Sequence, residues 1–221
     1  MFKIAHRGYS EYYKDNTLEA FEQAVKHGFD MIEMDIQLDK NKELVIFHDL
    51  HIKDKWVKDM TLDEIQIIHP QILSLEQFFT QFDYQSIELY FDLKGSEDVV
   101  PQLLKYIQKS NINSSKIWFA SFNIKHLELL RRNNSSHKLG FITGNILPHE
   151  MINELIQNYD LSFVCFDWNA FDQQCADFIR SHNILVFYYT VTSPSVLNLT
   201  SGYKMDGIVS NIKLPPFQAY E

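Results

Sequence analysis

The 221-residue sequence has little of several features that define large protein classes. It has two cysteines, Cys165 and Cys175, without a CxxC pair or a zinc-ligand spacing, which excludes a disulfide scaffold. Cys165 lies in an apolar run and is expected to be a buried, inert thiol. No apolar run approaches the ~18 residues of a membrane-spanning helix. None of the seven glycines forms the GxGxxG motif or P-loop expected of a doubly wound nucleotide-binding sheet.

Positive charge is also scarce, since 20 Lys and Arg face 29 Asp and Glu for a net charge of −9. This balance, without any basic run, argues against nucleic-acid binding and against adsorption on anionic membranes. An anionic substrate would need a locally positive site, which Arg7, Lys94 and a bound cation could supply. The chain begins directly with an expected strand, so we expect no signal peptide, no membrane anchor and a cytoplasmic location. The sequence indicates no oligomeric state.

What the sequence does have is a regular alternation of strand-like and helix-like stretches, without a linker, over residues 1–221. We therefore expect one domain. The expected strands are 2–6, 31–37, 44–48, 86–93, 116–121, 138–143, 162–167, 184–191 and 206–210. The expected helices are 17–27, 62–69, 75–82, 97–109, 124–133, 149–158, 172–182 and 194–201.

This alternation predicts a parallel α/β sheet closed into a (β/α)8 TIM barrel, with an open doubly wound sheet as the alternative. Nine strand candidates exceed the eight positions of the barrel. The link from Asp39 to Glu43 is too short for a helical crossover. Strands 31–37 and 44–48 are therefore expected to form a hairpin, or one of them to lie outside the barrel.

Polar clusters occur at the ends of four expected strands, where a barrel gathers its catalytic groups. Glu33 and Asp35 are spaced i, i+2, so strand alternation puts both carboxylates on one face, where they can hold a hard cation. Asp92 and Lys94 repeat the spacing. The other two clusters, which add two imidazoles and a fixed cation, are His6-Arg7-Gly8 and His48-Asp49. Together these groups indicate a metal-dependent phosphodiesterase.

In this order and spacing, the clusters resemble the glycerophosphodiester phosphodiesterase family. The resemblance covers nearly the whole chain and is strongest up to Asp49. The motifs that carry it are His6-Arg7-Gly8, Asp15-Asn16-Thr17, Glu33-Met34-Asp35, His48-Asp49, Asp92-Leu93-Lys94, Ser121-Phe122, Tyr189-Thr190-Val191-Thr192 and Asp206-Gly207-Ile208.

The resemblance implies a TIM barrel that uses one divalent cation, Mg²⁺ or Ca²⁺, to hydrolyse glycerophosphodiesters to glycerol 3-phosphate and an alcohol. It implies metal ligation by Glu33, Asp35 and Asp92. It also implies acid/base catalysis by His6 and His48. Arg7 and Lys94 would bind the substrate phosphate, and Phe122 and Tyr189 would lie in the pocket wall.

The sequence departs from the family pattern at several positions. Asp15 and Asp92 each replace a Glu but keep its charge, so we expect metal binding to survive. Tyr189 replaces a Trp, and Ser210-Asn211 replaces Thr-Asp. These last changes are expected to alter the pocket wall and with it the identity of the substrate.

Three side chains have simpler expected roles. Asn16 is expected to cap the first helix, with Glu19 as its third residue, and Asp15 could hold Arg7. His126 is expected on a helix surface.

Two other functions compete with the implied one. The same site could act on another phosphodiester, as in lysophospholipase D and sphingomyelinase D-like enzymes. A non-catalytic barrel could instead bind a phosphorylated ligand, although such a protein has no need of two proton-carrying histidines.

Overall fold

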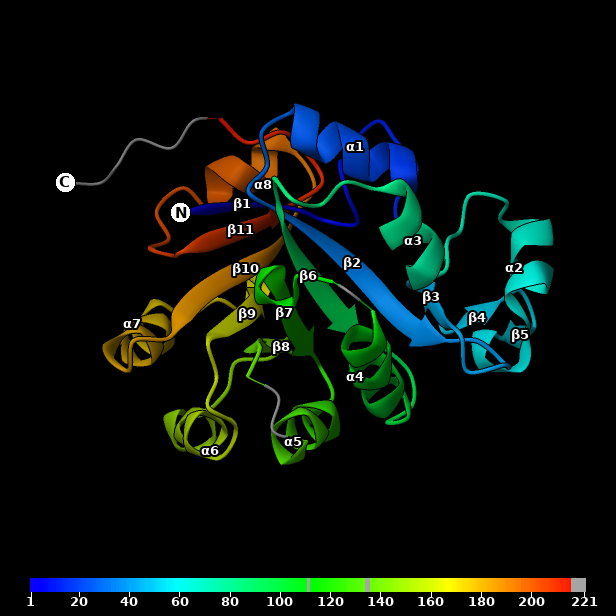
Figure 1. Ribbon diagram of the computed structural model, residues 1–221. Helices are drawn as coiled ribbons and strands as arrows, with labels where there is room; N and C mark the ends of the chain where they lie inside the picture. Colours follow the sequence, from blue (N-terminus) through cyan, green and yellow to red (C-terminus); the bar gives the residue numbers. More distant parts are fainter. Residues whose placement is uncertain (111, 134–135, 216–221) are drawn as a thin grey trace.

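The computed structural model describes residues 1–110, 112–133 and 136–215, and its centre is a closed barrel of eight parallel strands (Figure 1). Strand β1 pairs with both β2 and β11, which closes the sheet and rules out the open doubly wound alternative. The predicted TIM barrel is therefore confirmed. Its strands are β1 (Phe2–Ala5), β2 (Met31–Leu38), β6 (Glu88–Leu93), β7 (Ile117–Ser121), β8 (Lys138–Thr143), β9 (Phe163–Asp167), β10 (Leu185–Val191) and β11 (Gly207–Ser210).

The helices lie around the outside of this barrel (Figure 1). Their starts follow from local capping, because Thr61 and Ser74 each form a capping box with the residue three positions later. The helices of the described part of the chain are α1 (Leu18–Lys26), α2 (Leu62–Ile68), α3 (Leu75–Gln81), α4 (Val99–Lys109), α5 (Ile124–Arg132), α6 (His149–Tyr159), α7 (Gln173–Ser181) and α8 (Pro194–Leu199). Each corresponds to a predicted helix.

The predicted strand in excess of the eight barrel positions is β3 (Leu44–Ile46). It pairs antiparallel with β2 and lies outside the barrel, so the hairpin prediction is confirmed. The Asp39 carboxylate accepts hydrogen bonds from the backbone N–H groups of Asn41 and Glu43 and thereby shapes the hairpin turn. After β3 comes a small hairpin of β4 (His51–Ile52) and β5 (Lys55–Trp56), which the sequence analysis did not predict.

Residues 44–73, which we call the insertion, have a hydrophobic core of their own. Val57, Met60 and Ile65 pack there with Val45 from β3 and Ile52 from β4. In Figure 1 the insertion lies beside the barrel, next to β2. Its small core holds the β4–β5 hairpin against the strand end that carries His48.

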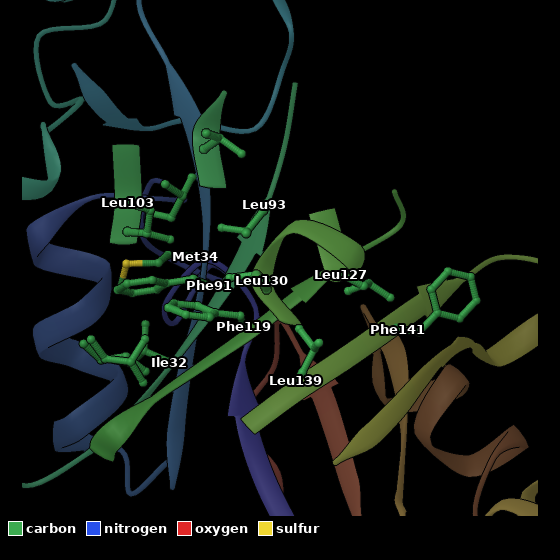
Figure 2. Close-up of a cluster of buried hydrophobic side chains, with 14 of the residues drawn as sticks. Ile32, Met34, Phe91, Leu93, Leu103, Phe119, Leu127, Leu130, Leu139 and Phe141 are labelled. Carbon is green, nitrogen blue, oxygen red and sulfur yellow. The ribbon is translucent and has the colours of Figure 1, made fainter. Parts of the chain in front are cut away.

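The main core fills the layer between the barrel and its helices. Figure 2 shows Ile32 and Met34 from β2, Phe91 from β6 and Phe119 from β7 in this layer. Each fully buried side chain of this size contributes about 1.5–3 kcal/mol through loss of contact with water. These residues alternate with the inward-facing Glu33 and Asp35 of β2, so packing on the outer face orients the carboxylates toward the interior.

The inside of the barrel at the N-terminal ends of the strands is filled by aromatic rings. Phe163 and Phe187 stack with ring centroids 4.8 Å apart, and Trp118 packs 5.6 Å from Phe163. A Cβ atom at Gly140 would lie 2.1 Å from Phe163, so only glycine leaves room for this ring. The barrel interior is therefore closed by packed side chains at the N-terminal ends of the strands, and its open space lies at their C-terminal ends.

Candidate active site

A cavity of about 120 Å³ lies at the C-terminal mouth of the barrel. All nine residues that the sequence singles out line it, although they come from six separate segments of the chain. They are His6, Arg7, Glu33, Asp35, His48, Asp92, Lys94, Phe122 and Tyr189. The remaining wall includes Tyr90 and Cys165, which is free and buried as expected.

Three buried carboxylates form the centre of the cavity. Asp35 and Asp92 are register partners on β2 and β6, and each of the side chains of Glu33, Asp35 and Asp92 offers an oxygen within 4.8 Å of the others. Oδ1 of Asp92 is buried without a hydrogen-bond partner in the described part of the chain. Hard cations such as Mg²⁺ and Ca²⁺ bind through oxygen ligands of this kind. The donor set therefore fits one divalent cation, and the unpartnered oxygen is a ready ligand.

Two cationic side chains lie against these carboxylates. The Arg7 Nε atom is 3.1 Å from Oδ2 of Asp35, and the Lys94 Nζ atom is 2.6 Å from Oδ2 of Asp92 and 3.4 Å from Oδ1 of Asp35. Three negative charges thus meet two positive ones. A divalent cation together with a singly charged phosphodiester would bring the charges of the cavity to zero.

Burial, and after it the excess of negative charge, raises the pKa of two of these carboxyl groups. Burial raises the pKa of Glu33 well above its usual range, and the neighbouring Asp35 and Asp92 add to the increase. Burial also raises the pKa of Asp92, which Lys94 opposes only in part. Buried carboxylates of like charge are unfavourable unless a cation compensates them, so these shifts support a cation site.

The turn after β1 places Arg7 beside the carboxylates. Arg7 and Gly8 both have left-handed backbone conformations, with φ of 57° and 81°. A Cβ atom at Gly8 would lie 2.7 Å from the backbone of Ala20 on α1, so the turn needs glycine there. The backbone N–H of Arg7 donates to Oε2 of Glu33 at 2.8 Å. Asp15 lies 3.4 Å from Nη1 of Arg7, which confirms the expected contact.

The two histidines have different partners. Nδ1 of His6 lies 2.6 Å from Oδ1 of Asn211; because this amide oxygen only accepts, Nδ1 carries the proton and Nε2 of the neutral ring is the proton acceptor. Burial and the nearby Arg7 lower the pKa of His6 to about 4. Nδ1 of His48 instead lies 2.7 Å from the carboxylate of Asp49. The sequence analysis put Asn211 in the pocket wall, whereas its amide holds the His6 ring.

Two buried side chains that orient the site were missed by sequence reasoning. Asn16 is not the helix cap, which is Thr17; its Nδ2 donates to Oδ2 of Asp35 at 2.8 Å. The prediction for Asn16 was wrong because its left-handed backbone, with φ of 56°, turns the side chain into the barrel. Nε2 of Gln37 donates to the carbonyls of Phe47 and Asp49 and so fixes the backbone on either side of His48. The sequence signal available for Gln37 was its position two residues after Asp35, which puts both side chains on one face of the strand.

The predicted surface position of His126 is also wrong, since the residue is only 1% exposed. The hydroxyl of Ser121 donates to the carbonyl of Leu93 at 2.9 Å, and Nδ1 of His126 lies 2.9 Å from the same hydroxyl oxygen. These contacts join the ends of β6 and β7. They therefore support the loop positions of Lys94 and Phe122, which follow directly on those strands.

Two aromatic rings lie in the outer wall of the cavity. Phe122 and Tyr189 meet edge to face with centroids 5.8 Å apart, and Lys94 Nζ lies 5.0 Å from the Phe122 ring centroid.

No helix in the described ranges has the length and apolar character needed to cross a membrane.

Comparison with known proteins gives a consistent result. Residues 6–212 match the model of the glycerophosphoryl diester phosphodiesterase family. The chain is 26% identical over 231 residues to a glycerophosphodiester phosphodiesterase of Caldanaerobacter subterraneus, covering 94% of this chain and 93% of the relative. A Bacillus subtilis protein of the same name is 25% identical over 244 residues, covering 94% of this chain and 82% of that protein.

Solved structures share the fold. A phosphodiesterase of Oleispira antarctica, in complex with the product sn-glycerol-3-phosphate, matches with a TM-score of 0.86 at 20% identity, over 96% of this chain and 94% of the other. A glycerophosphodiester phosphodiesterase of Thermotoga maritima matches with a TM-score of 0.80 at 22% identity, again over 96% and 94%.

Proposed function

Because the chain belongs to the glycerophosphoryl diester phosphodiesterase family, we propose that it hydrolyses glycerophosphodiesters to glycerol 3-phosphate and an alcohol with one divalent cation, Mg²⁺ or Ca²⁺. The observation that carries this proposal is the cluster of Glu33, Asp35 and Asp92, buried at the barrel mouth between Arg7 and Lys94. By itself, such a cluster of buried carboxylates opposes folding. Its excess negative charge is balanced by a divalent cation together with a bound, singly charged phosphodiester.

The three carboxylates would hold the cation, and Asn16 would keep Asp35 in place. When bound, a divalent cation withdraws electron density from the phosphoryl oxygens. Arg7 and Lys94 would bind phosphate oxygens. Their positive charge opposes the negative charge that builds up on these oxygens as the new bond forms.

His6 is the general base in this proposal, and His48 is the general acid. The Asn211 amide fixes the His6 tautomer with Nε2 free to accept a proton, and the low pKa keeps the ring neutral. A hydrogen bond to the Asp49 carboxylate holds the orientation of the His48 ring through Nδ1. His6 takes the proton of the attacking oxygen, whether from water or from the substrate's own hydroxyl, and His48 protonates the leaving oxygen.

The test is a screen of glycerophosphodiesters with Mg²⁺, with Ca²⁺ and with excess EDTA. We expect glycerol 3-phosphate and a free alcohol, in amounts that fall to background after chelation. Release of a lipid phosphate or a cyclic lipid product from lysophospholipids, without turnover of glycerophosphodiesters, would assign the same site to the alternative phosphodiesters. No turnover of either class in any metal would contradict the proposal.

A further inference from the structure

Lys94 lies where the pairing of β6 with its neighbouring strands ends. On the β2 side, the backbone N–H of Lys94 donates to the carbonyl of Ile36 at 2.8 Å. On the β7 side, the register stops one residue before Leu93. A side chain continues the connection there, because the hydroxyl of Ser121 donates to the Leu93 carbonyl at 2.9 Å. The backbone next to Lys94 is therefore attached to β7 through this hydroxyl group.

The hydrogen-bonding capacity of the Ser121 hydroxyl is fully used. Its single hydrogen goes to the Leu93 carbonyl, and its oxygen accepts from the backbone N–H of Asn123 at 3.0 Å. The remaining contact is with Nδ1 of His126, at 2.9 Å. A hydroxyl has one hydrogen and two acceptor positions, so Nδ1 must be the donor in this contact. With Nδ1 unprotonated, the ring would instead compete with Leu93 for the hydrogen.

The His126 ring is not explained by packing. It is buried on α5, and its Nε2 atom has no hydrogen-bond partner in the described part of the chain. A buried polar atom without a partner opposes folding, whereas a hydrocarbon side chain in the same place would not. The donor at Nδ1 is the property of this ring that a leucine would lack.

Lys94 has reason to need a fixed backbone. Its Nζ atom now lies 2.6 Å from Asp92 and 3.4 Å from Asp35, and binding of a phosphate requires the ammonium group to turn away from these carboxylates. The side chain has four rotatable carbon bonds, so the backbone decides which positions its ammonium group can reach. Gly95, with φ of 74°, turns the chain away directly after Lys94. No further strand residue on this side holds the backbone in place.

We propose that His126 is a positioning residue for phosphate binding. Its Nδ1–H group fixes the Ser121 hydroxyl on the Leu93 carbonyl, and this holds the backbone of Lys94 where the ammonium group reaches the phosphate. His126 acts through Ser121 and makes no contact with the phosphate itself. This inference rests on the proposed function, which assigns Lys94 to the phosphate.

The experiment compares His126→Gln with His126→Asn, its matched control. The amide nitrogen of Asn takes the place of Nδ1 and keeps the donor, whereas the longer Gln reaches the place of Nε2. The probe is inorganic phosphate, titrated calorimetrically in saturating Mg²⁺. His126→Gln should weaken phosphate binding about tenfold, the effect of one lost hydrogen bond, and His126→Asn at most about threefold. With a glycerophosphodiester, KM should rise by the same factor while kcat changes little.

A double-mutant cycle tests whether His126 acts through Lys94. In a Lys94→Met chain, adding His126→Gln should not weaken phosphate binding further, because both changes affect the same ammonium group. Ser121→Ala should reproduce the loss seen in His126→Gln, and it provides the test if that variant does not fold. Equal losses in His126→Asn and His126→Gln would show that only the bulk of the ring matters. That result, unchanged binding in Ser121→Ala or a further loss in the double variant would each overturn the proposal.

A spectroscopic measurement tests the tautomer without substrate. Nitrogen-15 NMR shows which ring nitrogen carries the proton, and the signals of His126 are identified by their loss in His126→Asn. We expect the proton on Nδ1 in the natural chain and on Nε2 in Ser121→Ala. A proton on Nε2 in the natural chain would overturn the proposal.

The two proposals can fail separately. The expected tautomer and the expected phosphate affinities, in a chain that hydrolyses no glycerophosphodiester, would leave the role of His126 standing and defeat only the reaction. An active natural chain whose phosphate affinity does not change in His126→Gln would defeat only the positioning role.

Discussion

The two ends of the barrel interior are built from the same strands but hold opposite kinds of side chain. At the N-terminal ends, Trp118, Phe163 and Phe187 pack as a dry aromatic layer. At the C-terminal ends, Glu33 and Asp92 lie buried with raised pKa values because of burial. The first arrangement contributes stability, whereas the second opposes it.

This contrast teaches where each kind of mutation should act. Changes among the carboxylates and histidines should reduce catalysis and leave the free energy of unfolding unchanged or increased. Changes in the aromatic layer should reduce stability and leave catalysis nearly intact. The two ends can therefore be separated by measuring both properties on the same set of variants.

The largest effect is expected for Glu33→Gln. The amide keeps the shape of the side chain and can still accept from the Arg7 backbone, but it removes a charged metal ligand. We expect kcat/KM to fall by more than about 10³-fold, since a bound cation contributes several kcal/mol to the transition state. The free energy of unfolding of the metal-free protein should stay equal or increase, because an unfavourable buried charge is gone. A marked loss of stability in urea unfolding would contradict the comparison.

Removal of either imidazole comes next. His6→Ala and His48→Ala should each lower kcat by ~10²–10⁴-fold, which is typical of a lost general acid or base. The circular dichroism spectrum and the unfolding midpoint should change little. Turnover close to that of the natural chain, on a substrate with a poor leaving group, would remove that histidine from the proposed mechanism.

At the other end of the barrel, Phe163→Ala should lower the free energy of unfolding by about 3–5 kcal/mol, because it leaves a cavity in the aromatic layer. We expect kcat at a temperature where the variant is folded to stay within about threefold of the natural value. Leu199→Ala is the control, since Leu199 is 69% exposed and its loss should not change stability. A large fall in kcat with unchanged stability would mean that the two ends are not separable.

A smaller effect is expected at Asn16, which touches Asp35 but lies outside the cavity lining. Asn16→Ala should weaken metal affinity by about 10–100-fold, as is usual when a side chain that orients a metal ligand is lost. Activity should recover at high metal concentration. Titration of activity against Mg²⁺ and Ca²⁺ distinguishes this from a catalytic role, which excess metal would not restore.

The smallest change is expected for Asp92→Glu, which lengthens the carboxylate by one methylene and keeps its charge. It should remain active with equal or tighter dependence on metal, whereas Asp92→Ala should lose metal binding and activity together. Metal titrations of both variants provide the measurement. An Asp92→Ala variant that needs no more metal and turns over as fast would show that Asp92 is not a ligand.

The strand and helix ranges were readable from the sequence because each depends on local periodicity and capping. The alternation of β2 likewise predicted that Glu33 and Asp35 share a face, and the cavity lining bears this out. The β4–β5 hairpin was missed because its strands are only two residues long. Such short strands have too few positions to show a period.

The sequence by itself therefore determined the barrel, its excess strand and the nine side chains that meet at its mouth. Only the tertiary structure decided what supports them. Asn16 reaches Asp35, Asn211 holds the ring of His6, and Trp56 comes to line one hollow together with Phe122. These partners are far apart along the chain, His6 and Asn211 by 205 positions. No local pattern encodes such pairs, because barrel closure and the packing of the insertion bring them together.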